Sequence, residues 1–165
     1  MLMKLFTTTL QSELTQFMEH DIKLTAIGDI QRLPQDCQEA LHQAIEVTKH
    51  NQGLHLIAAL SYSGRWEITA AAKALAQDVL AGKIKLPAIN AKLFQSYLST
   101  VSIPDPDLLI RTGGDLRISN FLLWQLAYTE LFIAPTYWPD FRKEHLYKAI
   151  AAYQKRKRRF GRINE

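Results

Sequence analysis

The sequence lacks the features that mark several classes of protein. It has one cysteine in 165 residues, which excludes an internal disulfide and favours a reducing compartment. No apolar run is long enough to span a bilayer, because the longest one, Phe121–Pro135, is interrupted by Gln125 and Glu130. The first residues lack the basic segment and apolar run of a signal peptide. We therefore expect a cytoplasmic protein with no transmembrane segment.

An excess of charge of one sign is also nearly absent. The formal net charge is +4 and the hydrophobic content is 47%, values that suit a globular protein with an anionic ligand. A charge of this size does not call for a nucleic acid partner. Part of it lies in the basic run Lys155–Arg159. Since we find no repeat or linker, the sequence predicts one domain over residues 1–165.

Helical and extended patterns alternate along the chain. Met3–Glu19 has apolar residues at helical spacing, Pro34 suits the first turn of a helix that runs to about Asn51, and Leu54–Leu60 is apolar enough to predict a strand buried on both faces. The alternation predicts an α/β fold, with helices flanking a parallel sheet that binds its ligand at the carboxyl ends of the strands. The remaining predicted elements are the strands Ile22–Ile27, Asp107–Arg111 and Glu130–Ala134 and the helices Trp66–Ala81, Asn90–Leu98, Ser119–Tyr128 and Lys143–Arg159. The expected inner face of Trp66–Ala81 is Ile68, Ala72, Leu75 and Val79, and Asn90 is placed to cap the helix that it begins.

The segment Arg111–Asn120 has the composition of a diphosphate-binding loop. Arg111 ends an apolar strand, a Gly-Gly pair follows one residue later, and Arg117 supplies a second guanidinium group. Arginine binds phosphate oxygens in a bidentate way, and Ser119 is placed to cap a helix whose first turn favours an anion. The combination predicts a nest for a diphosphate. The alternative is a surface turn with two solvated arginines and an ordinary helix cap.

Glu130 is a candidate ligand for Mg²⁺. It begins an apolar strand that we expect near the two arginines, and Mg²⁺ is usually held by one or two carboxylates together with substrate phosphates. An ion pair with Arg111 or Arg117 is an equally good interpretation of the pattern. Asp115 is a second candidate ligand, although its place in a loop favours solvation.

Four segments together resemble one known family. Leu108–Leu131, which contains Arg-Thr-Gly-Gly-Asp-Leu-Arg-Ile-Ser-Asn, is similar to the core signature of the cis-prenyltransferases, whose bacterial members make undecaprenyl diphosphate. Tyr62–Ile68 resembles the motif that precedes this signature. Trp138–Phe141 and Arg158–Gly161 resemble the two motifs that follow it. The resemblance covers the chain from about Leu2 onward.

The resemblance implies roles for particular residues. Glu130 matches the glutamate that helps to bind Mg²⁺ in the family. Arg159 and Gly161, near the C-terminus, match an arginine and a glycine of the family. In the family these two residues reach the diphosphate of isopentenyl diphosphate from the partner subunit of a homodimer. The substrate-binding residues implied in this way are Arg111, Arg117, Ile118, Ser119, Arg159 and Gly161.

The same resemblance implies a reaction. We expect the condensation of isopentenyl diphosphate with an allylic diphosphate, such as farnesyl diphosphate, to a cis-polyprenyl diphosphate. Mg²⁺ and cationic groups would stabilise the charge of the leaving diphosphate. The lipid product implies a loose association with membranes.

One departure from the family affects the expected activity. Members of the family open with the loop Asp-Gly-Asn-Gly-Arg-Trp, whose aspartate is the main Mg²⁺ ligand and is catalytic, and this loop does not occur in the 165 residues. We therefore expect an N-terminally truncated chain, the C-terminal portion of the family's domain, with no catalytic residue of its own and no activity alone. The alternatives are a non-catalytic partner subunit of a cis-prenyltransferase complex, against which the retained binding residues argue, and an unrelated phosphate-binding α/β module.

Overall fold

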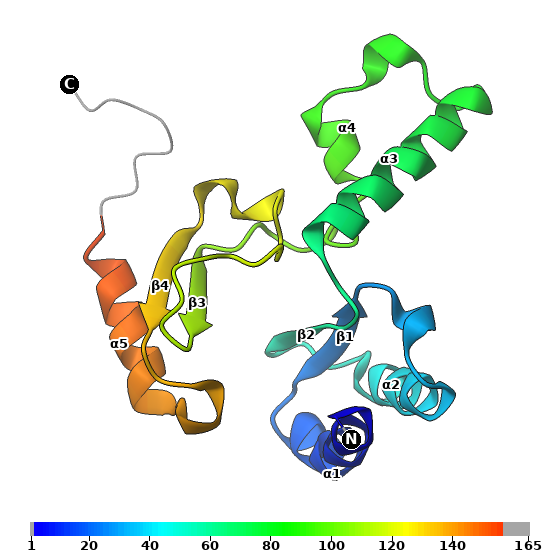
Figure 1. Ribbon diagram of the computed structural model, residues 1–165. Coiled ribbons are helices and arrows are strands. Elements are labelled where there is room, and N and C mark those ends of the chain that lie inside the picture. The colour runs from blue at the N-terminus through cyan, green and yellow to red at the C-terminus, as the bar shows by residue number, and fades with distance from the viewer. Residues whose placement is uncertain (1, 157–165) are drawn as a thin grey trace. The chain divides into compact units, whose positions relative to one another are not determined.

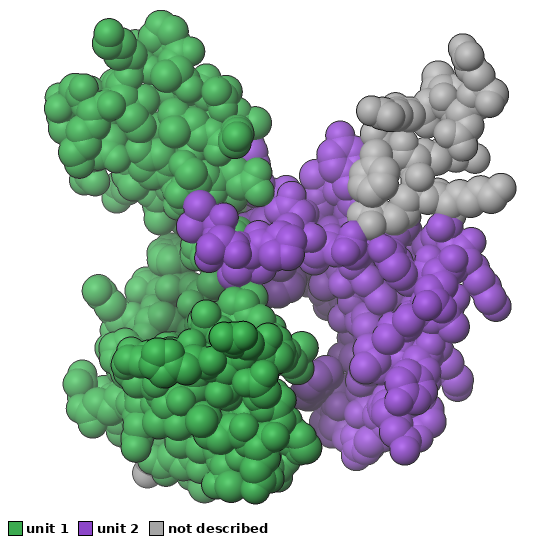
Figure 2. Space-filling model, turned by 180° about the vertical axis from the view of Figure 1, so that it is seen from behind, with its two compact units in different colours: residues 1–100 green, residues 101–165 purple. Residues whose placement is uncertain are grey.

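The structure, a computed structural model, describes residues 2–156. Its contacts divide the chain into two compact units, Met1–Thr100 and Val101–Glu165 (Figure 2), each of which is described by itself. The single domain over residues 1–165 stays a prediction. Among the described helices, none is both long and apolar enough to cross a membrane.

The first unit alternates helices and strands (Figure 1). Its two strands pair in parallel, with Lys23 opposite His55 and Ile27 opposite Ala59. Helix α2 connects them, which is the usual crossover between parallel strands. The elements are α1 (Leu2–Glu19), β1 (Lys23–Ile27), α2 (Gln35–Thr48), β2 (His55–Ala59), α3 (Gly64–Leu80) and α4 (Ala91–Gln95).

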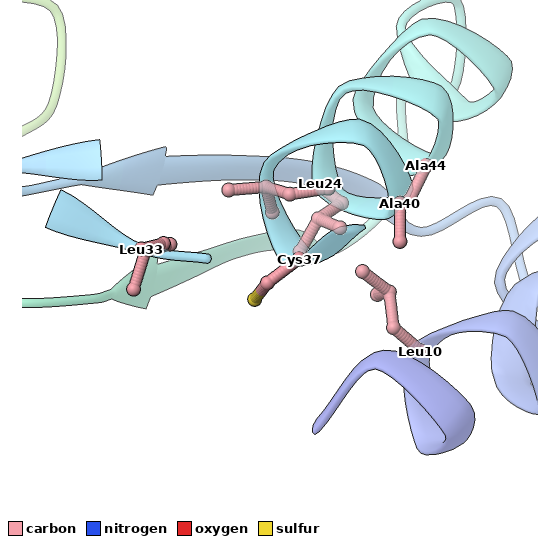
Figure 3. Packing of buried hydrophobic residues seen from close by; sticks show 7 residues of the cluster. Leu10, Leu24, Leu33, Cys37, Ala40 and Ala44 are labelled. Carbon is pink, nitrogen blue, oxygen red and sulfur yellow. The ribbon is translucent and has the colours of Figure 1, made fainter. Parts of the chain in front are cut away.

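The core of this unit lies where α1, α2 and β1 meet (Figure 3). Helix α2 buries residues three or four positions apart, which is the spacing of one helical face. Its face packs against Leu10 of α1 and Leu24 of β1. The buried cluster comprises Leu10, Leu24, Leu33, Cys37, Ala40, Leu41 and Ala44.

Thr48 ties the end of α2 to β1. Its side chain is fully buried. The hydroxyl donates to the Ala44 carbonyl at 2.8 Å and accepts from the Leu24 N–H at 3.1 Å. The same oxygen therefore satisfies the buried backbone of a strand and fixes it to the helix, as the burial of polar groups requires.

Two predictions about burial in this unit are wrong. Strand β2 forms as expected, but His55, Leu56 and Ala59 are exposed, because its one strand neighbour in the described sheet is β1. The predicted inner face of α3 included Ala72, which is exposed. The buried positions of α3 are instead Gly64, Glu67, Ala71 and Leu75.

The start of α3 explains the shift of its inner face. Ser63 caps the helix by accepting a hydrogen bond from the Trp66 N–H at 3.3 Å. Glu67 is 3% exposed, and its carboxylate accepts hydrogen bonds from the Tyr62 hydroxyl at 2.6 Å and the Ser99 N–H at 3.0 Å. A charged residue occupies the inner face because both partners lie there. The short helix α4 is capped by Asn90, as predicted.

The second unit contains β3 (Leu108–Thr112), β4 (Glu130–Ala134) and α5 (Lys143–Gln154), with α5 packed on β4 (Figure 1). The strands are parallel, with Leu108 opposite Glu130 and Thr112 opposite Ala134. The parallel strands and flanking helices of the predicted α/β class are confirmed. In the described residues they form two separate two-stranded sheets.

The helix predicted at Ser119–Tyr128 does not form. Ser119, Asn120 and Leu122 have φ values of 47°, 63° and 45°, in the left-handed region that a right-handed helix excludes. A short 3₁₀ helix at Gln125–Tyr128 is all that remains of it. Helix α5 ends at Gln154, and the predicted extension to Arg159 runs beyond the described residues.

The Thr48 contact predicts a stability difference between two similar variants. Thr48→Val keeps the shape but leaves the buried Leu24 N–H without its acceptor, so we expect a loss of about 1–3 kcal/mol in the free energy of unfolding. Thr48→Ser keeps the hydroxyl and loses one methyl group, about 0.8 kcal/mol. Urea denaturation of both variants measures the difference. A Thr48→Val protein as stable as the parent chain would show that the hydrogen bond contributes nothing.

Candidate functional site

Arg111 is the centre of a cluster at the carboxyl end of β3. One of its terminal nitrogens, Nη1, donates to the Ser119 hydroxyl at 2.8 Å and to the Arg117 carbonyl at 2.6 Å. The side chain is 23% exposed. These contacts fold the loop after β3 back over its own strand, so that Arg111, Arg117 and Ser119 lie together as the sequence predicted.

Asp115 has a role that the sequence did not reveal. Its carboxylate accepts a hydrogen bond from Arg117 and lies 3.4 Å from Nη2 of Arg111. The Asp115 side chain is 47% exposed, as its predicted solvation requires, but its carboxylate also joins the two guanidinium groups. The three side chains together carry a formal charge of +1, which leaves the cluster cationic.

The two glycines of the loop adopt the conformation expected of them. Gly113 and Gly114 have φ values of 89° and 78°, which glycine tolerates without strain. Their N–H groups donate to Thr136 and Ala134 of the neighbouring chain segment, both at 2.9 Å. These donors are therefore used to extend the strand pairing, and the side chains of the loop remain as its anion-binding groups.

Ser119 does not cap a helix, which corrects the prediction made for it. Its positive φ turns the chain away from helical geometry, and its hydroxyl accepts from Arg111 instead. An open pocket of about 320 Å³ lies beside the cluster. The pocket is lined by Leu109, Ile110, Arg111, Thr112, Ile118, Ser119 and Phe121.

One donor of Arg111 has no partner. Its Nε atom is buried and makes no hydrogen bond within the described residues. An unpaired buried donor is costly, typically about 1–3 kcal/mol. The exposed side chains of Arg117 and Ser119 and the excess positive charge of the cluster can attract an oxygen-rich anion, whereas a ligand could reach the buried Nε only if Arg111 moved.

Glu130 lies at the other end of the strand pair. It begins β4 opposite Leu108, whereas Arg111 is opposite Ile133, a separation of three residues or about 10 Å along the strands. The expectation that Glu130 stands at the same end as the arginines is therefore wrong, as is the ion pair with Arg111 or Arg117. Its partner is Arg156, whose Nη1 donates to Oε2 at 2.5 Å.

Glu130 remains the candidate ligand for the predicted Mg²⁺ site. Among them no group of three or more His, Cys, Asp or Glu side chains converges. Glu130 is 26% exposed and fits as a single carboxylate ligand, because Mg²⁺ commonly takes its other ligands from water and substrate phosphates. Arg159 and Gly161, the remaining predicted binding residues, lie outside the described residues.

The motif Tyr62–Ile68 belongs to the first unit. Arg65 and Trp66 line an open pocket of about 330 Å³ on α3 with Thr69, Ala70 and Lys73. Glu67, which the sequence marked only as part of a motif, is the residue that holds Tyr62. In the sequence, a glutamate among apolar residues at helical spacing is the signal that would have identified Glu67.

Comparisons with known proteins agree with this motif set. Residues 1–161 match a family model described as "Putative undecaprenyl diphosphate synthase". The chain is 50% identical over 164 residues to the isoprenyl transferase of Chlorobaculum tepidum, covering 99% of this chain and 62% of that protein. It is 51% identical over 164 residues to the isoprenyl transferase of Porphyromonas gingivalis, covering 99% and 65%. The chain thus spans less than two thirds of the length of these relatives.

A solved structure shows the same fold. Lavandulyl diphosphate synthase from Lavandula x intermedia, crystallised in complex with dimethylallyl diphosphate, superposes with a TM-score of 0.93 and 39% sequence identity. The match covers 97% of this chain and 70% of that one. The chain therefore belongs to the cis-prenyltransferase family, the enzyme family of the undecaprenyl diphosphate synthases.

Proposed function

We propose that this chain carries the isopentenyl diphosphate half of a cis-prenyltransferase active site, with residues 1–165 as the C-terminal portion of the family's domain. The observation that carries the proposal is the guanidinium group of Arg111. It is fixed by Ser119 and the Arg117 carbonyl beside an open pocket, and Asp115 joins it to the exposed guanidinium group of Arg117. The net positive charge of this cluster attracts a diphosphate.

The reaction in this proposal is the condensation of isopentenyl diphosphate with an allylic diphosphate such as farnesyl diphosphate, giving a cis-polyprenyl diphosphate. Arg111 and Arg117 bind and orient the diphosphate, and Ser119 holds Arg111 in place. Ile118 and the apolar side chains of the pocket face the substrate's hydrocarbon part. A preorganised cationic cluster lowers the energy of bound negative charge without rearrangement.

Mg²⁺ is the proposed cofactor, with Glu130 as one ligand. The metal would neutralise diphosphate charge as a Lewis acid. The pairing of Glu130 with Arg156 orients its carboxylate. The single carboxylate implies that substrate phosphates provide further ligands.

The proposed assembly is a homodimer in the cytoplasm. Arg159 and Gly161 would contact the diphosphate bound by the other copy, and the lipid product would bring the enzyme to membranes. The positive charge of Lys157, Arg158 and Arg159 supports a role in anion binding. The single cysteine, Cys37, is buried and free, which suits a reducing compartment.

The Arg111 cluster predicts a strong difference between two Arg→Lys variants. Arg111→Lys removes the guanidinium group that contacts both Ser119 and the ligand. We therefore expect the affinity for isopentenyl diphosphate to fall about tenfold or more, the effect of losing a charged hydrogen bond. Arg142→Lys is the matched control, since the guanidinium group of Arg142 donates to the Pro139 and Phe141 carbonyls. Calorimetric titration without metal measures both. Equal affinities would remove Arg111 from the site.

An elongation assay tests the chain as a whole. Residues 1–165 contain no Asp-Gly-Asn-Gly-Arg-Trp loop, so we expect them to bind isopentenyl diphosphate but to form no elongated product with farnesyl diphosphate and Mg²⁺. Product formation by the purified 165 residues would overturn this expectation. Adding a separate relative that carries the loop tests the partner-subunit alternative, which a rise in the turnover of that relative would support.

A further inference from the structure

The guanidinium group of Arg156 grips the beginning of β4 at two points. Nη1 donates to Oε2 of Glu130 at 2.5 Å, and Nη2 donates to the Leu131 carbonyl at 2.9 Å. The Arg156 and Glu130 side chains are 39% and 26% exposed, so the pair is partly shielded from solvent. A lysine ammonium group is a single point and cannot span both acceptors in this way.

This contact leaves one oxygen of Glu130 unused. Within the described residues, no hydrogen bond to Oε1 is found, whereas Oε2 is held by Arg156. A carboxylate held at one oxygen has a fixed orientation, and its second oxygen remains able to bind a cation. Residues that hold a metal ligand in this way contribute strongly to metal affinity in other proteins.

The position of Arg156 in the chain gives the contact a second consequence. It follows α5 by two residues, and α5 itself packs on β4. The two hydrogen bonds of Arg156 therefore hold the end of α5 against the beginning of β4.

We propose that Arg156 is a positioning residue that orients Glu130 for its ligand and tethers the end of α5 to the beginning of β4. The proposal rests on the proposed function only in taking Glu130 as a cation ligand. The tether depends on the two hydrogen bonds alone. Neither role needs Arg156 to touch the substrate.

Hydrogen exchange of the 165-residue protein tests the tether. In Arg156→Gln and in Glu130→Gln we expect amide exchange to rise roughly two- to fivefold at the end of α5 and the beginning of β4, the range for a partly exposed ion pair. The double variant should exchange no faster than either single one, because both changes break the same contact. Lys155→Gln removes the same charge from a neighbouring exposed residue and should leave exchange unchanged.

Binding of Mn²⁺, as a substitute for Mg²⁺ that electron paramagnetic resonance detects, tests the orientation of Glu130. With isopentenyl diphosphate present, Arg156→Lys keeps the charge but loses the two-point grip, so we expect Mn²⁺ affinity to fall roughly threefold or more. Lys155→Arg, the matched control, should not change it. An affinity for Mn²⁺ that is unchanged or higher in Arg156→Lys would overturn the orienting role. Arg156 would then have no effect on cation binding, or it would compete with the cation for the Glu130 carboxylate.

The two measurements separate this proposal from the proposed function. If the double variant exchanged faster than either single variant, the tether would be overturned, even though isopentenyl diphosphate still binds. Failure of every variant and of the parent chain to bind isopentenyl diphosphate would instead contradict the proposed function, and the exchange result would still support or exclude the tether.

Discussion

The parallel register of β3 and β4 is the constraint on which the second unit depends. It places Arg111 opposite Ile133 and Glu130 opposite Leu108, so the cationic cluster and the acidic group occupy opposite ends of one strand pair. A separation of about 10 Å prevents these groups from neutralising each other directly. Each instead acquires its own partner, Asp115 for Arg111 and Arg156 for Glu130, which orients it.

The cluster around Arg111 shows how a short loop can prepare an anion site without a helix N-terminus. Positive φ angles at Gly113, Gly114 and Ser119 reverse the chain within a few residues. The reversal brings the Ser119 hydroxyl and the Arg117 carbonyl to the same guanidinium nitrogen. These contacts fix the orientation of the Arg111 side chain. Preorganisation of this kind reduces the cost of ordering the arginine on binding.

In the first unit, buried polar side chains likewise fix the geometry, but within an apolar core. One face of α2 and the strand β1 form a core with α1, and Thr48 supplies the polar connection between helix and strand. Glu67 does the same for α3, where it joins Tyr62 to Ser99. Buried polar groups of this type are stable only when they are hydrogen-bonded, so they fix the geometry of the segments that they join.

The sequence by itself determined the parallel α/β class, the extents of most helices and strands, the family, and the grouping of Arg111, Arg117 and Ser119. These follow from local periodicity, capping and motif, which depend on residues close together in the chain. Only the tertiary structure decided that Ser119–Tyr128 is not helical, that Asp115 bridges two arginines, and that Glu130 pairs with Arg156. Those outcomes depend on strand register and on contacts between residues as far apart as Glu130 and Arg156, which no local pattern encodes.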